Sequence, residues 1–317
     1  MTVQTVQIHD AAATARVTPY PALVDALRVA VIDYANGRIV SPERLVVPLN
    51  DGGILLSMPA TAPDLAIHKL VNVCPRNGER ALPTIHGQVM AFDADTGATR
   101  FILDGPTVTG RRTAAMSMLG IETLGEAAPC DVLLIGTGTQ AANHATALAE
   151  LYPYARIRVR GRTLARAKAF CDAHRAQAPN LEPLDGDGDG AATPASVDLV
   201  IALTTSRAAV YDEAPRAGRL VIGVGAFTPE MIELGARTVL GSALFVDDLA
   251  GARHEAGDFL QAGVDWNTVT GIADALGSGA AAARPADRPV VFKSVGCAAW
   301  DLAACRVAHV TLAADAA

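Results

Sequence analysis

The sequence has few aromatic residues and few cysteines, and each shortage limits what the protein can be. Phe, Trp and Tyr together make up 4% of the 317 residues, so the interior must be built from Ala, Val, Leu and Ile. The five cysteines are scattered and form no Cys-x-x-Cys pair, which argues against a disulfide-stapled scaffold and against a cysteine zinc site. This cysteine usage favours a reducing compartment, so we expect a cytoplasmic protein.

Long apolar runs and long basic runs are also missing. No apolar stretch reaches the roughly 18 residues that cross a bilayer, and the N-terminus lacks the basic and apolar regions of a signal peptide. The 26 basic residues are outnumbered by 33 acidic ones, which gives a net charge of −7 without a Lys/Arg-rich run. We therefore expect no membrane insertion, no secretion and no nucleic acid partner.

The pattern that remains predicts an α/β protein of about two domains, taking roughly 150 residues per domain. Helical spacing predicts a helix over 20–37, and short β-rich segments separated by glycine turns predict a mostly antiparallel sheet over 44–105. A further helix is expected from Pro106 into the 120s. From Asp131 onward apolar strands alternate with helices, which is typical of a parallel, doubly wound sheet.

The last segment, from Val295 to the end, is predicted to be helical. It carries Trp300, Ala303, Val307 and Val310 at helical spacing. This apolar stripe predicts that the C-terminal helix returns to pack on the first domain.

A glycine motif follows the apolar strand that begins at Asp131. It reads Gly136-Thr137-Gly138-Thr139-Gln140-Ala141 and opens a predicted helix. In this context the glycines permit a tight turn and a close approach of backbone to a pyrophosphate, and the alanine permits close helix-strand packing. The motif predicts dinucleotide binding; the alternative is a purely structural glycine turn.

The end of the next strand indicates which dinucleotide is bound. An acidic residue that holds the ribose hydroxyls of NAD is absent there, and the chain reads Arg160-Gly161-Arg162-Thr163. Two arginines and a threonine can hold a 2′-phosphate by charge-assisted hydrogen bonds. We expect NADP(H) to be preferred, with NAD(H) as the alternative cofactor. If the arginines do not bind a cofactor, they are solvated charges at the edge of the sheet.

Three cations, Arg44, Lys69 and Arg112, stand in otherwise apolar segments of the N-terminal half. A lysine in an apolar strand is costly unless its ammonium has a partner, and a carboxylate-bearing ligand would supply one. For any one of the three, a snorkelling surface cation is the alternative.

A metal site is not expected. Asp185, Asp187 and Asp189 imitate the start of a calcium loop, but Ser196 stands where the bidentate glutamate would be needed. Gly-Asp repeats of this kind also form ordinary turns.

Six segments, in order along most of the chain, resemble the ornithine cyclodeaminase/mu-crystallin family. They are Thr109-Gly110-Arg111-Arg112-Thr113-Ala114-Ala115, the glycine motif, Val224-Gly225, Val246-Asp247-Asp248, Val291-Phe292-Lys293-Ser294-Val295-Gly296 and Trp300-Asp301. The resemblance implies a homodimer and a Rossmann domain over 119–289. It also implies that 1–118 and 290–317 form an α+β domain for substrate binding and dimerisation.

The resemblance also implies roles for individual residues. Lys69 matches the family's substrate-site lysine, so we expect it to be the catalytic residue. Arg112 matches the family's carboxylate-binding arginine, and Arg44 matches a second such arginine. Further cofactor contacts are implied for Thr113, Thr204 and Val224, and for Lys293 and Ser294 near the nicotinamide end.

Two positions depart from the family members that cyclise ornithine. Those members carry an aspartate shortly after the Val-Gly pair and a glutamate ahead of Met-Pro, where this chain has Phe227 and Leu56. A cyclodeaminase needs carboxylates to receive a basic side chain and manage the released amine.

The sequence therefore predicts an NAD(P)-dependent amino or imino acid oxidoreductase. The leading hypothesis is a ketimine reductase acting on pyrroline-2-carboxylate or piperideine-2-carboxylate, or an amino acid dehydrogenase. The alternatives are ornithine cyclodeaminase, which makes L-proline and ammonia, and a non-catalytic NADPH-binding protein of the crystallin type.

Overall fold

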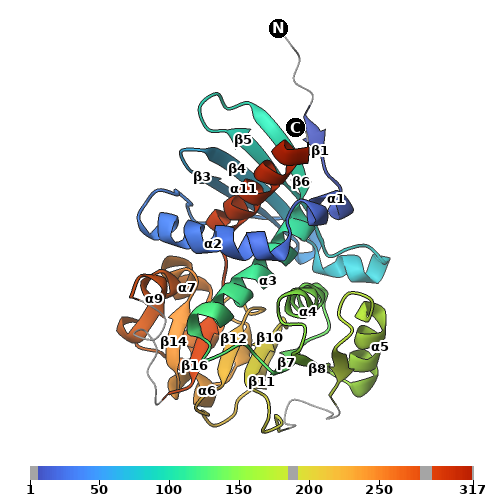
Figure 1. Ribbon diagram of the computed structural model, residues 1–317, viewed down its shortest axis with the longest axis vertical. Coiled ribbons are helices and arrows are strands. Elements are labelled where there is room, and N and C mark those ends of the chain that lie inside the picture. The colour runs from blue at the N-terminus through green and yellow to red at the C-terminus, as the bar shows by residue number, and fades with distance from the viewer. Residues whose placement is uncertain (1–5, 185–191, 279–287, 316–317) are drawn as a thin grey trace. The chain divides into compact units, whose positions relative to one another are not determined.

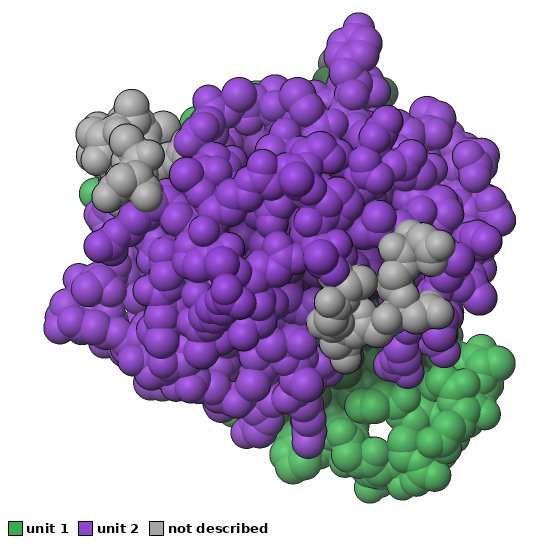
Figure 2. Space-filling view, turned by 90° about the horizontal axis from the view of Figure 1, so that it is seen from below, with its two compact units in different colours: residues 1–112, 297–317 green, residues 113–296 purple. Residues whose placement is uncertain are grey.

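The computed structural model describes residues 6–184, 192–278 and 288–315. The chain divides into two compact units: unit 1 contains 1–112 and 297–317, and unit 2 contains 113–296 (Figure 2). Each unit combines one large sheet with helices, so the predicted α/β class is confirmed. Among the described helices, none has both the length and the apolarity of a membrane-spanning segment.

Unit 1 is built on a six-stranded sheet with the order β1-β6-β5-β4-β3-β2. The strands from β2 to β6 pair antiparallel, as predicted for 44–105, while β1 adds parallel to β6. The strands are β1 (Gln7–Ile8), β2 (Leu45–Pro48), β3 (Ile54–Thr61), β4 (Leu65–Val73), β5 (Ile85–Asp93) and β6 (Thr99–Asp104). Short 3-10 turns lie at Asn50–Gly52 and Pro75–Arg80.

Helices cover one face of this sheet. In β4 the burial alternates, and Leu65, Ile67, Lys69 and Val71 lie on the covered face. The C-terminal helix α11 (Ala298–Asp315) packs on β3 and β4 beside α2 (Tyr20–Ala35) (Figure 1). The helix α1 (Ala11–Arg16) contacts β6. This packing confirms that the C-terminal helix returns to the first domain.

The predicted apolar stripe of the C-terminal helix needs two corrections. The helix begins at Ala298 rather than at Val295. Trp300, Ala303 and Val307 are buried as expected, but the side chain of Val310 is 69% exposed. The stripe ends one turn early because the final turns of α11 lie on the surface of unit 1.

Unit 2 is built on an eight-stranded parallel sheet with the order β15-β14-β16-β12-β10-β7-β8-β9. Its strands are β7 (Asp131–Ile135), β8 (Arg156–Arg160), β9 (Leu181–Pro183), β10 (Leu199–Ala202), β12 (Leu220–Gly223), β14 (Ala243–Val246), β15 (Val269–Gly271) and β16 (Val290–Lys293). A small parallel pair is formed by β11 (Arg207–Tyr211) and β13 (Ile232–Leu234). The predicted doubly wound sheet is confirmed, and its order reverses direction at β7, next to β10.

The helices of unit 2 follow its strands along the chain (Figure 1). They are α4 (Thr139–Leu151), α5 (Leu164–His174), α6 (Ala236–Leu240), α7 (Leu249–Glu255), α8 (Gly257–Ala262) and α9 (Ile272–Ser278), with a 3-10 turn at Trp266–Thr268. The helix α3 (Gly105–Leu124) contains the boundary between the units. The sequence predicts this boundary slightly later, at 118.

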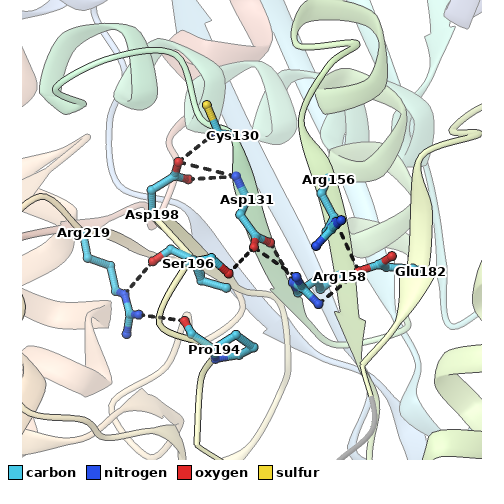
Figure 3. Close-up of polar contacts among 10 residues, drawn as sticks. Cys130, Asp131, Arg156, Arg158, Glu182, Pro194, Ser196, Asp198 and Arg219 are labelled. Atoms are coloured by element: carbon cyan, nitrogen blue, oxygen red, sulfur yellow. Dashed lines mark hydrogen bonds and ion pairs between the residues drawn. The ribbon is translucent and has the colours of Figure 1, made fainter.

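The amino ends of β7 and β8 are fixed by a polar network (Figure 3). Asp131 accepts hydrogen bonds from Arg158 Nε at 2.7 Å and from the Ser196 hydroxyl at 2.5 Å. Asp198 accepts from the backbone N–H of Cys130 at 2.8 Å. Asp131 and Asp198 are therefore engaged in contacts within the protein. A ligand site is expected instead at the carboxyl ends of the strands.

Candidate functional site

A cavity of about 480 Å³ opens at the carboxyl ends of β7, β8 and β10. This is the point where the strand order reverses, the usual ligand crevice of an open parallel sheet. Its lining includes Gly136, Thr137, Gly138, Arg160, Gly161, Arg162, Arg166, Thr204, Thr205 and Ser206. The structure thus brings together residues that the sequence analysis selected separately after three strands.

The glycine motif has the backbone geometry that its residue types predict. Gly136 has φ 129°, and a Cβ there would lie 2.7 Å from the carbonyl oxygen of Leu203, so glycine is required. A Cβ on Gly138 would meet open space. Thr139 and Gln140 begin α4, whose N-cap residue Gly138 has no side-chain cap. The N–H groups at this helix start are therefore suited to hold an anionic group.

Ala141, the last residue of the motif, is fully buried. Its position on the first turn of α4 fits the close helix-strand packing that the sequence analysis assigns to it. The motif therefore divides into three residues that line the cavity and three that form the helix start.

Three arginines converge on the cavity, one more than the sequence analysis selected. Arg160 is 5% exposed, and its Nε and Nη2 atoms have no hydrogen-bond partner among the described residues. Burial lowers the pKa of this guanidinium. Arg162 is exposed, and Arg166, four residues later, lies in the first turn of α5. Thr163 caps this helix, since its hydroxyl oxygen accepts the backbone N–H of Arg166 at 3.3 Å.

A second cluster lies within unit 1, where two of the predicted substrate cations meet one carboxylate. Lys69 Nζ is 2.6 Å from Asp301 Oδ2, and Arg112 Nε donates to Asp301 Oδ1 at 3.1 Å. All three side chains are buried. Asp301 from α11 thus supplies a carboxylate partner for Lys69 from within the chain. The binding of a ligand carboxylate by Lys69 stays a prediction.

The charges around Lys69 shift its protonation. Burial lowers the pKa of Lys69 to about 8; Asp301 opposes the shift, and Arg112 and the half-buried Arg44 add to it. The three predicted substrate cations thus lie within electrostatic reach of one another. Because Lys69 and Arg112 share the single carboxylate of Asp301, the ammonium and the guanidinium together can attract a further anion.

The remaining predicted cofactor residues lie in unit 2 with different degrees of enclosure. Thr204 is half-buried and lines the cavity, while Thr113 and Val224 are buried. The Ser294 hydroxyl donates to Asp247 Oδ2 at 2.9 Å. Lys293 is fully buried and its ammonium is 2.7 Å from Asp258 Oδ2, so any role in cofactor binding has to act through this carboxylate.

The two positions that depart from the ornithine-cyclising pattern carry apolar side chains with little or partial exposure. Leu56 is buried on β3 in unit 1, and Phe227 is half-buried after β12 in unit 2. Neither position offers a carboxylate as counter-ion for a basic substrate side chain.

Within the described ranges, no group of three or more His, Cys, Asp or Glu side chains could hold a metal ion. The Gly-Asp repeat with Asp185, Asp187 and Asp189 lies outside the described residues. All five cysteines are free.

Comparisons with known proteins point to one family. A model of the ornithine cyclodeaminase/mu-crystallin family matches residues 5–314. The chain is 62% identical over 311 residues to the Delta(1)-pyrroline-2-carboxylate/Delta(1)-piperideine-2-carboxylate reductase of Azospirillum brasilense, covering 98% of this chain and 97% of that protein. It is 62% identical over 300 residues to Delta(1)-pyrroline-2-carboxylate reductase 2 of Burkholderia ambifaria, covering 95% and 94% of the two chains.

Among solved structures, the fold matches that of Thermococcus litoralis Delta(1)-pyrroline-2-carboxylate reductase in complex with NADH and L-proline. The TM-score is 0.86 at 22% identity, with 98% of both chains covered. At this identity the likeness shows the fold alone.

Proposed function

The chain belongs to the ornithine cyclodeaminase/mu-crystallin family, and from this premise we propose that it is a nicotinamide-dependent reductase of cyclic imino acids. The substrates are Δ1-pyrroline-2-carboxylate and Δ1-piperideine-2-carboxylate. The observation that carries the proposal is the 62% identity, over 98% of the chain, to a reductase named for these two compounds. The buried cations of unit 1 and the cavity of unit 2 are consistent with it.

The cavity fits a nicotinamide dinucleotide. The open space over Gly138 leaves room for a pyrophosphate at the start of α4. Arg160 offers two buried nitrogen atoms that have no hydrogen-bond partner in the described part of the chain. When bound, the cofactor supplies a hydride to the carbon of the C=N bond. We assign the phosphate contacts to the glycine motif and to Thr204 at the rim of the cavity.

The phosphorylated cofactor is the better match for the three arginines. Arg162 and Arg166 stand at the exposed side of the cavity, where a 2′-phosphate can accept forked hydrogen bonds, and Thr163 retains a hydroxyl proton to donate. A guanidinium is matched to phosphate geometry, whereas NAD(H) would leave these donors to water. We therefore propose a preference for NADP(H) over NAD(H).

The chain's own residues bind and protonate the imino acid. Arg112 and Arg44 bind the substrate carboxylate, which orients the C=N bond. Asp301 holds Lys69 and Arg112 in place, since it pairs with both. As the C=N carbon receives the hydride, the π electrons move to nitrogen, and the Lys69 ammonium donates the proton that completes the amine. A lysine whose pKa is lowered to about 8 is a stronger acid than an ordinary one.

The proposal is tested by measuring the oxidation of NADPH with each cyclic imino acid, beside 2-oxo acids with ammonia and beside an ornithine assay for released ammonia. We expect turnover with the imino acids and little ammonia from ornithine, because Leu56 and Phe227 replace carboxylates. Efficient conversion of ornithine, or cofactor binding without any turnover, would contradict the proposal.

A matched pair of variants links the activity to the cluster. Arg112→Lys keeps the charge but loses the fork that orients the carboxylate, so kcat/KM should fall by about a hundredfold. Arg111→Lys is the control. Arg111 Nε donates to the carbonyl of Thr18 at 2.8 Å and its guanidinium stacks 3.9 Å over the Tyr20 ring. These contacts are structural, so kcat/KM should be retained.

We also propose that unit 1 binds the substrate and forms a homodimer. Its edge strand β2 exposes Leu45, Val46 and Val47 by 61%, 50% and 40%. An apolar edge strand of this kind is an aggregation hazard unless another chain covers it. A cytoplasmic location is proposed on the five free cysteines.

A further inference from the structure

A carboxylate without access to solvent lies inside unit 2, next to the proposed cofactor cavity. Glu233 on β13 is 0% exposed. Its Oε1 accepts the backbone N–H of Thr204 at 2.5 Å, and its Oε2 accepts those of Gly225 at 2.5 Å and Ala226 at 3.0 Å. Thus one side chain takes hydrogen bonds from three backbone groups.

The three donors belong to two different loops. Thr204 follows β10, whereas Gly225 and Ala226 follow β12, the neighbouring strand of the sheet. The loops are in close backbone contact, because a Cβ on Gly225 would lie 1.9 Å from the carbonyl oxygen of Thr204. Glu233 therefore joins the two loops, and Thr204 on the first of them lines the cavity.

A second carboxylate holds the strand that carries Glu233. Asp258 Oδ1 accepts the backbone N–H groups of Glu233 at 2.5 Å and Leu234 at 2.8 Å. Its Oδ2 pairs with the ammonium of Lys293, and both side chains are almost fully buried. The contacts thus run from β16 through Asp258 to β13 and on to the two loops.

Burying these charged side chains costs folding free energy. Burial raises the pKa of Glu233, and Lys293 and the bonded N–H groups oppose that shift. A buried ion network of this kind is often no more stable than an apolar replacement, so a use other than stability is expected. Here one of the three residues whose N–H groups it fixes, Thr204, lines the ligand cavity, and the other two belong to the loop packed against Thr204.

We propose that Glu233 is a positioning residue that fixes the loops after β10 and β12 for cofactor binding, with Asp258 and Lys293 holding Glu233 in place. The inference rests on the proposed binding of the cofactor in this cavity. It gives Lys293 a part in cofactor binding without direct contact.

The first test compares the wild type with Glu233→Gln. The glutamine amide keeps one acceptor oxygen but turns an N–H₂ toward one of the loops, which releases that loop. We expect the Kd for NADPH and the KM for the cofactor to rise about tenfold. The KM for the imino acid should change little. Glu233→Asp keeps the charge, but its side chain is one methylene shorter and cannot contact both loops. The Kd and the KM for the cofactor should therefore rise in this variant as well.

A purely structural role would have a different signature. It would lower thermal stability and the active fraction and leave the Kd and the cofactor KM unchanged. Asp131→Asn is the control, because Asp131 is a largely buried carboxylate at the opposite end of the sheet (Figure 3). It should lose stability and keep its cofactor Kd. Unchanged cofactor binding in Glu233→Gln would overturn the proposal.

A second test needs no substitution and so does not depend on the variant folding. Native-state hydrogen exchange should find the amides of Thr204, Gly225 and Ala226 protected about a hundredfold or more, although they lie in loops. Rapid exchange would overturn the proposal. If the wild type binds no cofactor at all, the proposed function fails as well. If the wild type binds NADPH and Glu233→Gln binds it with the same Kd, the inference alone fails.

Discussion

Replacing Lys69 with methionine should change how stability depends on pH. The pKa of Lys69 is lowered from 10.5 to about 8 in the folded protein because the side chain is buried. Between these two values the unfolded chain binds a proton that the folded chain does not, so the free energy of unfolding rises with pH in this window. Below pH 8 the folded protein carries the full cost of the buried ammonium.

The size of the effect follows from the shift. At 1.36 kcal/mol per pKa unit, the wild type should gain about 3 kcal/mol between pH 7 and pH 10.5 relative to Lys69→Met. Loss of the pair with Asp301 also lowers the stability of Lys69→Met, and this loss adds an offset to the comparison at both pH values. The difference between the two proteins therefore isolates the titration of Lys69.

The assay is urea unfolding of both proteins at pH 7 and at pH 10.5. Lys168→Met serves as the control, because Lys168 is exposed on α5. Its stability difference from the wild type should be nearly the same at both pH values. If the difference between wild type and Lys69→Met also stays constant within about 1 kcal/mol, the lowered pKa is refuted and with it the argument for Lys69 as an acid.

Four further outcomes are expected. The kcat/KM for imino acid reduction should fall above about pH 8, because Lys69 loses its proton there. Lys69→Ala should lower kcat, and if this variant changes KM alone, Lys69 only binds the substrate and is not the acid. Arg162→Ala should raise the Kd for NADPH ten- to a hundredfold in fluorescence titrations and leave that for NADH unchanged, and a wild type that prefers NADH would contradict the assignment. Val46→Glu on the exposed edge strand should shift the mass measured by light scattering from dimer to monomer, and a wild-type monomer would contradict the dimer.

Local patterns were sufficient for much of the fold and for the cofactor cavity. The apolar strand before Gly136 and the glycine spacing after it lie within one short segment, so the motif could be predicted from the sequence. The hairpin turns over 44–105 and the strand-helix alternation after Asp131 are local in the same way.

Contacts between distant residues could not be predicted from such patterns. Asp301 stands 232 residues after Lys69, and nothing in either segment indicates that their charges meet. The same holds for Lys293 and Asp258, and for β16, which inserts between β12 and β14. Helical spacing also wrongly predicted burial for Val310, because periodicity does not show where the surface covered by a helix ends.

The central claim is that this chain reduces the C=N bond of a cyclic imino acid. It is tested most directly by supplying NADPH that carries deuterium at both C4 positions together with Δ1-pyrroline-2-carboxylate, and analysing the product by mass spectrometry and NMR. The account predicts proline with one deuterium at C2 and none elsewhere, with equal amounts of cofactor oxidised and proline formed. Proline without the label, or no proline while the cofactor is bound, would contradict it.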